Sequence, residues 1–474
     1  MKKHFSMITV LALVSALLFS ACNGSTTAPE TTTTAADEKP VASATTNDAD
    51  VEVDDTKTSE DAGETAEDVT IHLLNMYISQ DEDANSIGFH TRRADFERDF
   101  PNVTIDLEAI AHDDYETKLK TYIAADELPD VFQSKGTMTK QLADDGLIHE
   151  ASAVLDLVPG WLEEYKDGVF EDYMYEGKPW ATPHQIGNNH NIYWNEELFA
   201  QVGISEFPET WDDFIAAIEI FKDNDIIPIS LGNKEQWPAP SLTLNTLVYR
   251  FCTPEWYYSV RDGTGAKFTD PGFIKAVQLY RDLVVMGAYN SDLNSIDVRQ
   301  QRTLYYNKQA AMMVDGYWGV GIMENEAPED VLAATKIGQL PAIPESMGGT
   351  NVANINQAAA GWAYFTNSNV TGYKLEMVAQ MCHYITGSEL ANIVVANCGM
   401  PATKPTFIDE TAVSPLYMDL LRFNDEVQYA PVFDSQLQAE IVDVFYSNLQ
   451  EVLIGTMTPE RYAELMQEAT DNSR

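Results

Sequence analysis

The chain has 474 residues, of which 45% are hydrophobic and 22% are charged, so it is long enough to bury two substantial cores. Its formal net charge at pH 7 is −45, which argues against a nucleic-acid-binding protein because such proteins need a basic face. The charge favours solubility and does not specify a fold.

The N-terminus has the pattern of a secretory signal. Two lysines precede an apolar run from Met7 to Phe19, which is shorter than the roughly 20 residues that a helix needs to span a bilayer. The run ends in small residues just before Cys22. We interpret residues 1–21 as a signal peptide that takes no part in the fold.

Residues 23–68 are predicted to be a disordered tether. Runs of Thr and Ala give way to many acidic residues, and the segment contains no aromatic residue. Such a composition cannot bury enough apolar surface to offset the entropy of the chain.

Apart from Cys22, which follows the signal, the cysteines are Cys252, Cys382 and Cys398. An odd number excludes a complete disulfide framework, and we interpret them as small buried thiols. A bond between Cys382 and Cys398 stays open at this point.

The folded body is predicted to begin with a β-α-β-α-β unit. Alternating apolar residues at 69–73 and 103–107 predict two strands, and residues 128–132 predict a third. The helix between the first two ends at Phe100, before a proline, and the next helix carries an apolar stripe within residues 115–123. This order is typical of a mostly parallel sheet, in which ligands bind beyond the carboxyl ends of the strands.

A second unit follows in the middle of the chain. Residues 191–194 form an apolar strand, and a helix starts at 195–199. Thr210 is the predicted N-cap of another helix, with Asp213 three residues on as the carboxylate variant of a capping box. The apolar face of this helix consists of Trp211, Phe214, Ile215 and Ile218.

Later segments continue the alternation of strands and helices. Residues 226–229 predict a short strand, and residues 374–386 predict a helix. Thr458 and Pro459 are placed to cap and start a C-terminal helix.

Several blocks of sequence resemble one family. These are "DFERDFPNVTID", "DDYETKLKTYIAADELPDVF", "EGKPWATP", "IYWNEELFAQVGI", "PETWDDF", "NKQAAMMVDGYWG" and "LQEVLIGTMTPERYAELMQEA". In order and spacing they are similar to the extracellular solute-binding proteins of sugar-importing bacterial ABC transporters. The resemblance covers about residues 69 to 470.

The resemblance implies an α/β fold of the periplasmic-binding-protein-like class II type, with two lobes joined by a multi-crossing hinge and a ligand cleft between them. The N-terminal lobe is expected at 69–182 and 342–398, and the C-terminal lobe at 183–341 and 399–474. The segments "IGQLPAIP" (337–344) and "NCGMPATKP" (397–405) resemble the second and third crossings.

At the N-terminus, Ser20-Ala21-Cys22 also resembles a bacterial lipobox, although Phe19 stands where the usual pattern has Leu. It implies that Cys22 is lipidated and that residues 22–68 tether the body to a membrane.

A sugar site needs flat apolar surfaces for stacking and planar polar groups at the edge. Three tryptophans lie beside a Gly or Pro, where a loop can turn into a cleft, and family position supports two of them. Trp211 is assigned to the core instead. The stacking candidates are Trp237, Trp318 and Trp362.

The polar candidates stand at predicted strand ends and crossings. Asp315 is the strongest, because a carboxylate that accepts two hydroxyls is a common sugar clamp. Each of the others can instead satisfy backbone groups of a loop. They are His184, Gln185, Gln133, Glu235, Asn75 and Tyr77.

No HExxH, CxxC, P-loop or GxSxG motif is present, so the sequence predicts no metal, no cofactor and no catalytic residues. We expect a monomeric binding protein that captures a sugar or oligosaccharide and delivers it to an ABC permease, without contact to nucleic acid. Its expected location is the extracellular face of the bacterial cytoplasmic membrane, through the lipid anchor, or the periplasm.

Two alternatives stay open. A secreted glycosidase needs two carboxyls roughly 5–10 Å apart, which folding can assemble from distant residues. The same binding fold can also take a non-sugar solute such as a peptide or a polyol.

Overall fold

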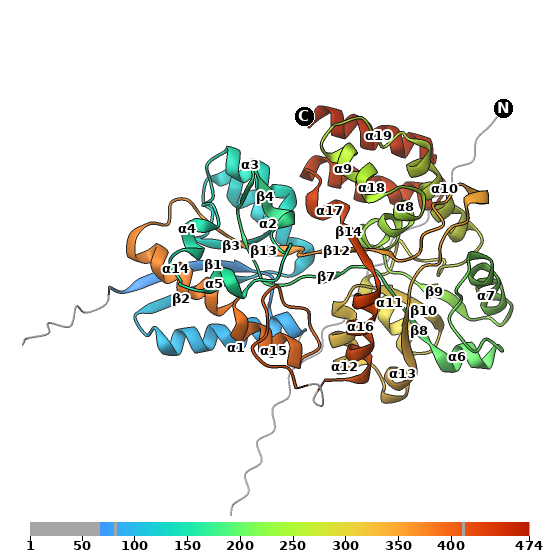
Figure 1. The fold of residues 1–474 in the computed structure, drawn as a ribbon, viewed down its shortest axis with the longest axis horizontal. Coiled ribbons are helices and arrows are strands. Elements are labelled where there is room, and N and C mark those ends of the chain that lie inside the picture. The colour runs from blue at the N-terminus through green and yellow to red at the C-terminus, as the bar shows by residue number, and fades with distance from the viewer. Residues whose placement is uncertain (1–66, 80–82, 410–412, 474) are drawn as a thin grey trace, which may run out of the picture. The chain divides into compact units, whose positions relative to one another are not determined.

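A computed structural model of the chain describes residues 67–79, 83–409 and 413–473. The predicted signal peptide, Cys22 and the tether up to residue 66 lie outside these residues. Residues Thr65–Arg474 form one compact unit. Within it the strands form two separate main sheets, one on each side of a group of crossing strands (Figure 1). We call the parts built on these sheets the first and the second lobe.

The sheet of the first lobe begins with the predicted parallel unit. β1 pairs in parallel with β2 on one side and with β3 on the other. The apolar alternation of β1 is confirmed, since Val69, Ile71 and Leu73 are buried. In sheet order the strands are β2 (Val103–Ala109), β1 (Val69–Asn75), β3 (Val131–Lys135), β13 (Trp362–Thr366) and β6 (Thr182–Pro183).

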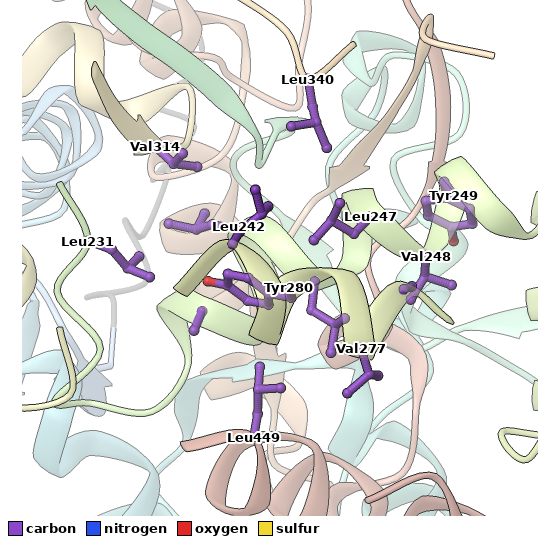
Figure 2. Close-up of a cluster of buried hydrophobic side chains, with 14 of the residues drawn as sticks. Leu231, Leu242, Leu247, Val248, Tyr249, Val277, Tyr280, Val314, Leu340 and Leu449 are labelled. Carbon is purple, nitrogen blue, oxygen red and sulfur yellow. The ribbon is translucent and has the colours of Figure 1, made fainter. Parts of the chain in front are cut away.

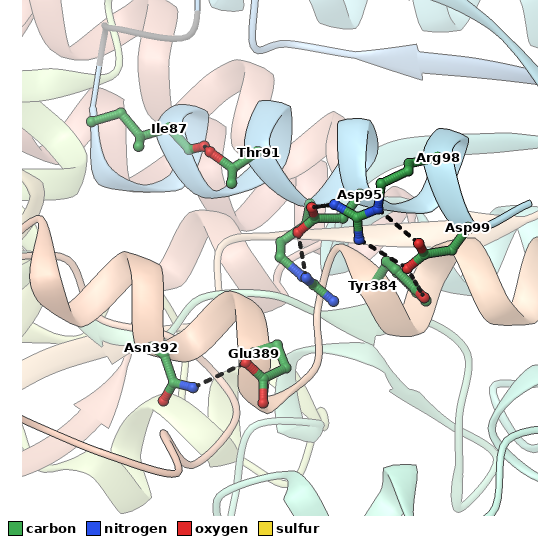
Figure 3. A network of polar contacts seen from close by, with 9 residues as sticks. Ile87, Thr91, Asp95, Arg98, Asp99, Tyr384, Glu389 and Asn392 are labelled. Atoms are coloured by element: carbon green, nitrogen blue, oxygen red, sulfur yellow. Dashed lines mark hydrogen bonds and ion pairs between the residues drawn. The ribbon is translucent and has the colours of Figure 1, made fainter. Parts of the chain in front are cut away.

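The helices of the first lobe pack on this sheet and on each other. The predicted C-terminal end of α1 is confirmed, since its C-cap is Phe100. In the close-up of α1, Arg98 donates hydrogen bonds to Asp95 and Asp99 of the same helix (Figure 3). Tyr384 of α14 donates its hydroxyl hydrogen to Asp99 and so ties the two helices together. The helices are α1 (Ala84–Asp99), α2 (His112–Ala125), α3 (Thr139–Asp144), α4 (Ser152–Leu155), α5 (Trp161–Glu164), α14 (Gly372–Tyr384) and α15 (Ser388–Ala396).

The sheet of the second lobe is mixed. β10 runs parallel to β9 and antiparallel to β8, and every residue of β8 and β10 is buried. Strands that are buried throughout need cover on both faces, which the surrounding helices provide. In sheet order the strands are β11 (Thr335–Gly338), β8 (Asn191–Asn195), β10 (Ala310–Asp315) and β9 (Ile227–Ser230).

A large hydrophobic cluster forms the core of the second lobe. In the close-up, Tyr280 and Val277 from α10 face Leu242, Leu247 and neighbouring side chains (Figure 2). The helices are α6 (Glu196–Gln201), α7 (Trp211–Asp223), α8 (Asn245–Phe251), α9 (Pro254–Arg261), α10 (Pro271–Val285), α11 (Val298–Tyr306), α12 (Trp318–Glu326), α13 (Glu329–Ala334), α16 (Pro415–Glu426), α17 (Phe433–Gln436), α18 (Ala439–Leu453) and α19 (Pro459–Asn472).

The predicted helix caps are confirmed. The Thr210 hydroxyl accepts from the Asp213 amide at 3.2 Å, and the Thr458 hydroxyl accepts from the Arg461 amide at 3.2 Å. Trp211 is buried, as expected for a core residue of α7.

Three short strands run between the two main sheets (Figure 1). β12 pairs in parallel with β14 and antiparallel with β7. Their bounds are β14 (Gln428–Pro431), β12 (Ile355–Ala359) and β7 (Gly187–Asn188). A two-stranded hairpin of β4 (Met174–Tyr175) and β5 (Lys178–Pro179) completes the strands of the described residues.

One of the predicted crossings is wrong. Residues 335–338 form an edge strand of the second sheet, and Leu340 and Ile343 pack into the core of the second lobe, so residues 337–344 do not return to the first. Residues 397–405 contact both lobes, because Cys398 packs in a second-lobe cluster while Ala402 joins a first-lobe cluster. The lobe boundaries themselves stay a prediction.

The cysteine question is also resolved. Cys252, Cys382 and Cys398 are buried and reduced, so Cys382 and Cys398 do not pair.

Candidate functional site

Four aromatic rings form a continuous row between the two lobes. The ring centroids of Trp318 and Trp237 lie 6.2 Å apart, and those of Trp237 and His112 lie 6.1 Å apart. The His112 and Trp362 centroids lie 5.6 Å apart at an interplanar angle of 73°. The structure therefore brings together all three tryptophans that the sequence singled out. We call Trp318, Trp237, His112 and Trp362 the aromatic row.

Trp318 reaches the row because a buried strand ends beside it. β10 stops at Asp315, and α12 starts at Trp318 after a turn at Gly316. A Cβ at Gly316 would lie only 2.3 Å from the Trp318 ring, so glycine allows the indole to fold over the turn. The Tyr193 hydroxyl donates to the Gly316 carbonyl at 2.8 Å and holds that turn.

Trp237 stands on a loop that is fixed at both ends. The loop follows β9 and leads into a π-helical segment at Ala239–Leu244, a geometry that is frequent at functional sites. The Asn233 side chain accepts from the Ala239 amide at 2.9 Å, and the Gln450 side chain donates to the Asn233 carbonyl. Trp237 itself is partly buried against the core of the second lobe.

Trp362 belongs to the first lobe and is held rigidly. It starts β13 and is 6% exposed. The Tyr115 ring meets it edge-on, with centroids 5.2 Å apart at 85°. The Lys135 ammonium lies 5.4 Å from the Trp362 ring centroid. Between Trp237 and Trp362, the row thus passes from the second lobe to the first.

Asp315 has a different environment from the one that a sugar clamp needs. It is 1% exposed, and its Oδ2 accepts from Arg302 Nε at 2.9 Å. Its Oδ1 accepts from the Gly316 amide at 2.8 Å. Both carboxylate oxygens are therefore engaged by protein groups, at the base of the turn that carries Trp318.

The polar candidates of the first lobe form one buried cluster. Asn75 donates to the Tyr364 hydroxyl at 3.0 Å and accepts from the Tyr77 amide at 2.7 Å. The Tyr77 hydroxyl and His184 Nε2 lie 2.6 Å apart, and Gln133 accepts from the Met76 amide. Burial lowers the pKa of His184 to about 3, so the cluster carries no charge at neutral pH.

Gln185 and Glu235 lie at the margins. The Asn85 side chain donates to Gln185 Oε1 at 2.7 Å, which adds α1 to the polar surface. Glu235 is half-buried in the loop beside Trp237.

Sequence reasoning missed several residues of this region. His112 starts α2 directly after β2, so the rule that ligands bind beyond the carboxyl ends of parallel strands points to it. Lys135 ends β3 in the same way. Tyr317 packs its ring on Gly187 of the first crossing strand, a long-range contact that no local pattern indicates.

Lys135 joins the two lobes through charged partners. Its Nζ lies 3.5 Å from Glu116 of α2, 3.6 Å from Asp434 of α17 and 3.3 Å from the Tyr446 hydroxyl of α18. Burial acts to lower the pKa of Lys135, but these neighbours outweigh it and raise the pKa. Lys135, Glu116 and Asp434 line a small pocket beside Trp362.

The described part of the chain holds no group of three or more His, Cys, Asp or Glu side chains placed to bind a metal ion. Within residues 67–79, 83–409 and 413–473, no helix combines the length and the apolar character needed to cross a bilayer.

Comparison with known proteins identifies the fold. The chain is 23% identical over 334 residues to PH1039 of Pyrococcus horikoshii, an uncharacterized ABC transporter extracellular-binding protein. The aligned residues cover 70% of each chain. It is 23% identical over 284 residues to the multiple sugar-binding protein of Streptococcus mutans, covering 56% of this chain and 62% of that protein. A solved structure described as a chitin oligosaccharide binding protein matches with a TM-score of 0.76 and 22% identity, covering 85% of this chain and 98% of that one.

These likenesses confirm the predicted two-lobed α/β fold. The chain spans less than two thirds of the Streptococcus protein. The model of the bacterial extracellular solute-binding proteins matches residues 89–369, well over half of the chain. The protein therefore belongs to the bacterial extracellular solute-binding protein family.

Proposed function

We propose that the protein is the substrate-binding component of an ABC importer and captures a sugar or an oligosaccharide between its lobes. The observation that carries this proposal is the aromatic row, which offers flat apolar faces from both lobes. Pyranose rings present C–H patches that pack on such faces. The names of the Streptococcus relative and of the chitin oligosaccharide binding protein support the same class of ligand.

The surroundings of the row favour an uncharged ligand. The buried polar cluster around Tyr77 and His184 is neutral, and His184 Nδ1 has no hydrogen-bond partner among the described residues, which leaves it for a hydroxyl at the rim of a sugar. Asp315 and Lys135 are each paired with opposite charges in the protein. We assign Asp315 to positioning the Trp318 turn, and the tryptophans with the neutral cluster to the ligand.

Capture proceeds by hinge bending in this proposal. Ligand contacts made by both lobes stabilise the closed arrangement, so binding shifts an open–closed equilibrium. We place the hinge at β7, β12 and β14, and the return to the first lobe near β12, because Ile343 and Ile355 pack in the core of the second lobe. The closed form then docks, as a monomer, on a membrane permease, and no bond in the ligand is cleaved.

The location follows from the N-terminus. Lipidation at Cys22 would hold the body at the extracellular face of the cytoplasmic membrane, and residues 23–68 would act as the tether. Growth with radioactive palmitate tests this, since Cys22→Ser should abolish the label.

A thermal-shift screen with mono- and oligosaccharides tests the ligand class. A ligand at 100 times its dissociation constant should add about 2.7 kcal/mol to the free energy of unfolding. Each sugar that shifts the melting temperature is then recovered and analysed. Recovery of intact sugar supports a binding protein, whereas cleaved sugar would establish a glycosidase.

Matched variants tie the binding to the aromatic row. Trp318→Ala and Trp237→Ala should each weaken the binding of an active sugar by about tenfold to a hundredfold. Trp256→Ala is the control, because Trp256 lies in the second lobe and bonds Asp270 rather than joining the row. Equal affinities of all three variants and the wild type would refute this site.

A further inference from the structure

His112 is the ring through which the aromatic row crosses between the lobes. It starts α2, directly beyond the carboxyl end of β2, and its side chain is exposed. It meets Trp362 of its own lobe at 5.6 Å and 73°, and Trp237 of the other lobe at 6.1 Å and 59°. One imidazole therefore contacts both indoles at once.

The two indoles differ in how firmly they are held. Trp362 is buried and is fixed by Tyr115, while Trp237 is partly buried on its loop. His112 stands at the first position of α2, and its side chain is exposed. The imidazole is therefore the least enclosed of the three rings.

The imidazole occupies the space that a sugar needs. Ring contacts form at centroid separations of about 4.5–7 Å, and the His112 ring lies within that range of both Trp237 and Trp362. A pyranose that packs between these two indoles cannot do so while His112 remains in place.

We propose that His112 is a self-occluding residue, whose ring takes the place of the ligand between Trp237 and Trp362 in the ligand-free protein. This proposal rests on the proposed function. A ligand must displace the imidazole before it can pack on both indoles, so only the fraction of molecules with His112 withdrawn is competent to bind. The apparent affinity is reduced by that fraction.

The contact itself is tested without any ligand. Acrylamide quenching of tryptophan fluorescence should increase in His112→Ala, because the removal of the ring exposes the two indoles. His112→Phe should quench like the wild type, since it keeps a ring. His72→Ala is the matched control, because His72 is an exposed histidine of the same lobe that pairs with Asp106.

A variant that lacks both indoles tests whether the change in quenching comes from Trp237 and Trp362. When Trp237 and Trp362 are both replaced by Phe, His112→Ala should no longer alter the quenching. Unchanged quenching in the single variant His112→Ala would overturn the proposal, and so would an increase that persists in this background.

Binding is then measured with maltotriose, xylotriose and triacetylchitotriose. Any of these that the wild type binds should bind His112→Ala about threefold to tenfold more tightly, and His72→Ala with wild-type affinity. Weaker binding by His112→Ala would overturn the proposal, because His112 would then be a ligand contact. If the wild type binds none of the three, the proposed function fails for these sugars, and the quenching result alone decides whether His112 covers the indoles.

Discussion

The assignment of Asp315 to a structural ion pair makes a sharp prediction. Asp315 and Arg302 are 2% and 9% exposed in their side chains, and their closest atoms lie 2.9 Å apart. Asp315→Asn keeps an oxygen for the Gly316 amide but removes the charge opposite a buried guanidinium. Breaking a buried pair in this way costs about 3–5 kcal/mol.

The expected change in melting temperature follows from the size of the folded unit. A unit of ~400 residues has an unfolding entropy of about 0.8 kcal/mol per kelvin, at roughly 2.1 cal/mol/K per residue. The ligand-free Asp315→Asn protein should therefore melt about 4–6 °C below the wild type in differential scanning calorimetry. Asp419→Asn is the control, because it breaks an exposed pair with Arg422 that is worth less than about 1 kcal/mol.

A double variant separates the pair from other effects of the substitution. Arg302→Met with Asp315→Leu removes both charges and should recover most of the lost stability. If Asp315→Asn melts like the wild type without ligand but loses the shift that a sugar produces, then the carboxylate contacts the sugar and the reasoning from its burial is wrong.

Four further predictions address the turn, the buried ionizable groups and the second lobe. Gly316→Ala places a Cβ where the Trp318 ring lies, so it should weaken sugar binding as much as Trp318→Ala while the ligand-free melting temperature changes little; isothermal titration with an active sugar measures this. Burial raises the pKa of Asp172 from 3.8 to about 6, so the folded protein holds this proton when the unfolded chain has lost it, and stability is lost as the pH rises from 4 to 6. Between pH 4 and 6, the free energy of unfolding of the wild type, measured with urea, should fall by up to about 3 kcal/mol more than that of Asp172→Asn. Equal pH dependence of the two proteins would contradict this. Burial lowers the pKa of His190 to about 3, so the folded protein loses stability relative to the unfolded chain as the pH drops below 6.5. In the same assay, this loss in the free energy of unfolding at pH 5 should be about 2 kcal/mol smaller for His190→Asn than for the wild type. Arg250 is 1% exposed and donates to the carbonyls of residues 340, 341 and 355, so Arg250→Met should cost about 2–4 kcal/mol and speed amide hydrogen exchange around these residues.

Local sequence signals predicted the elements of this fold well. The alternation at Val69, Ile71 and Leu73 and the caps at Thr210 and Thr458 depend on residues that are close in the chain, and the structure confirms them. The crossings depend on pairing between distant segments. Residues 355–359 pair with 428–431 and with 187–188, and nothing within any one of these segments indicates its partners.

The site shows the same division. A tryptophan beside a Gly or Pro is a local pattern, and the three tryptophans chosen in this way lie in one aromatic row. The role of Asp315 depends instead on Arg302, which α11 brings against it. His112 was missed because nothing near it in the sequence marks it, and only the fold brings Trp237 and Trp362 next to it.

Several charged groups near the row are paired with opposite charges within this acidic protein. Asp315 is opposite Arg302, and Lys135 is opposite Glu116 and Asp434, so each of these buried charges has an oppositely charged partner within the protein. An ionic solute would have to separate one of these pairs, and the buried partner left behind would cost several kcal/mol. A neutral ligand can pack on the indole faces and leave these pairs intact. The net charge of −45 therefore bears on solubility, while in the proposed function shape, stacking and hydrogen bonds select the ligand.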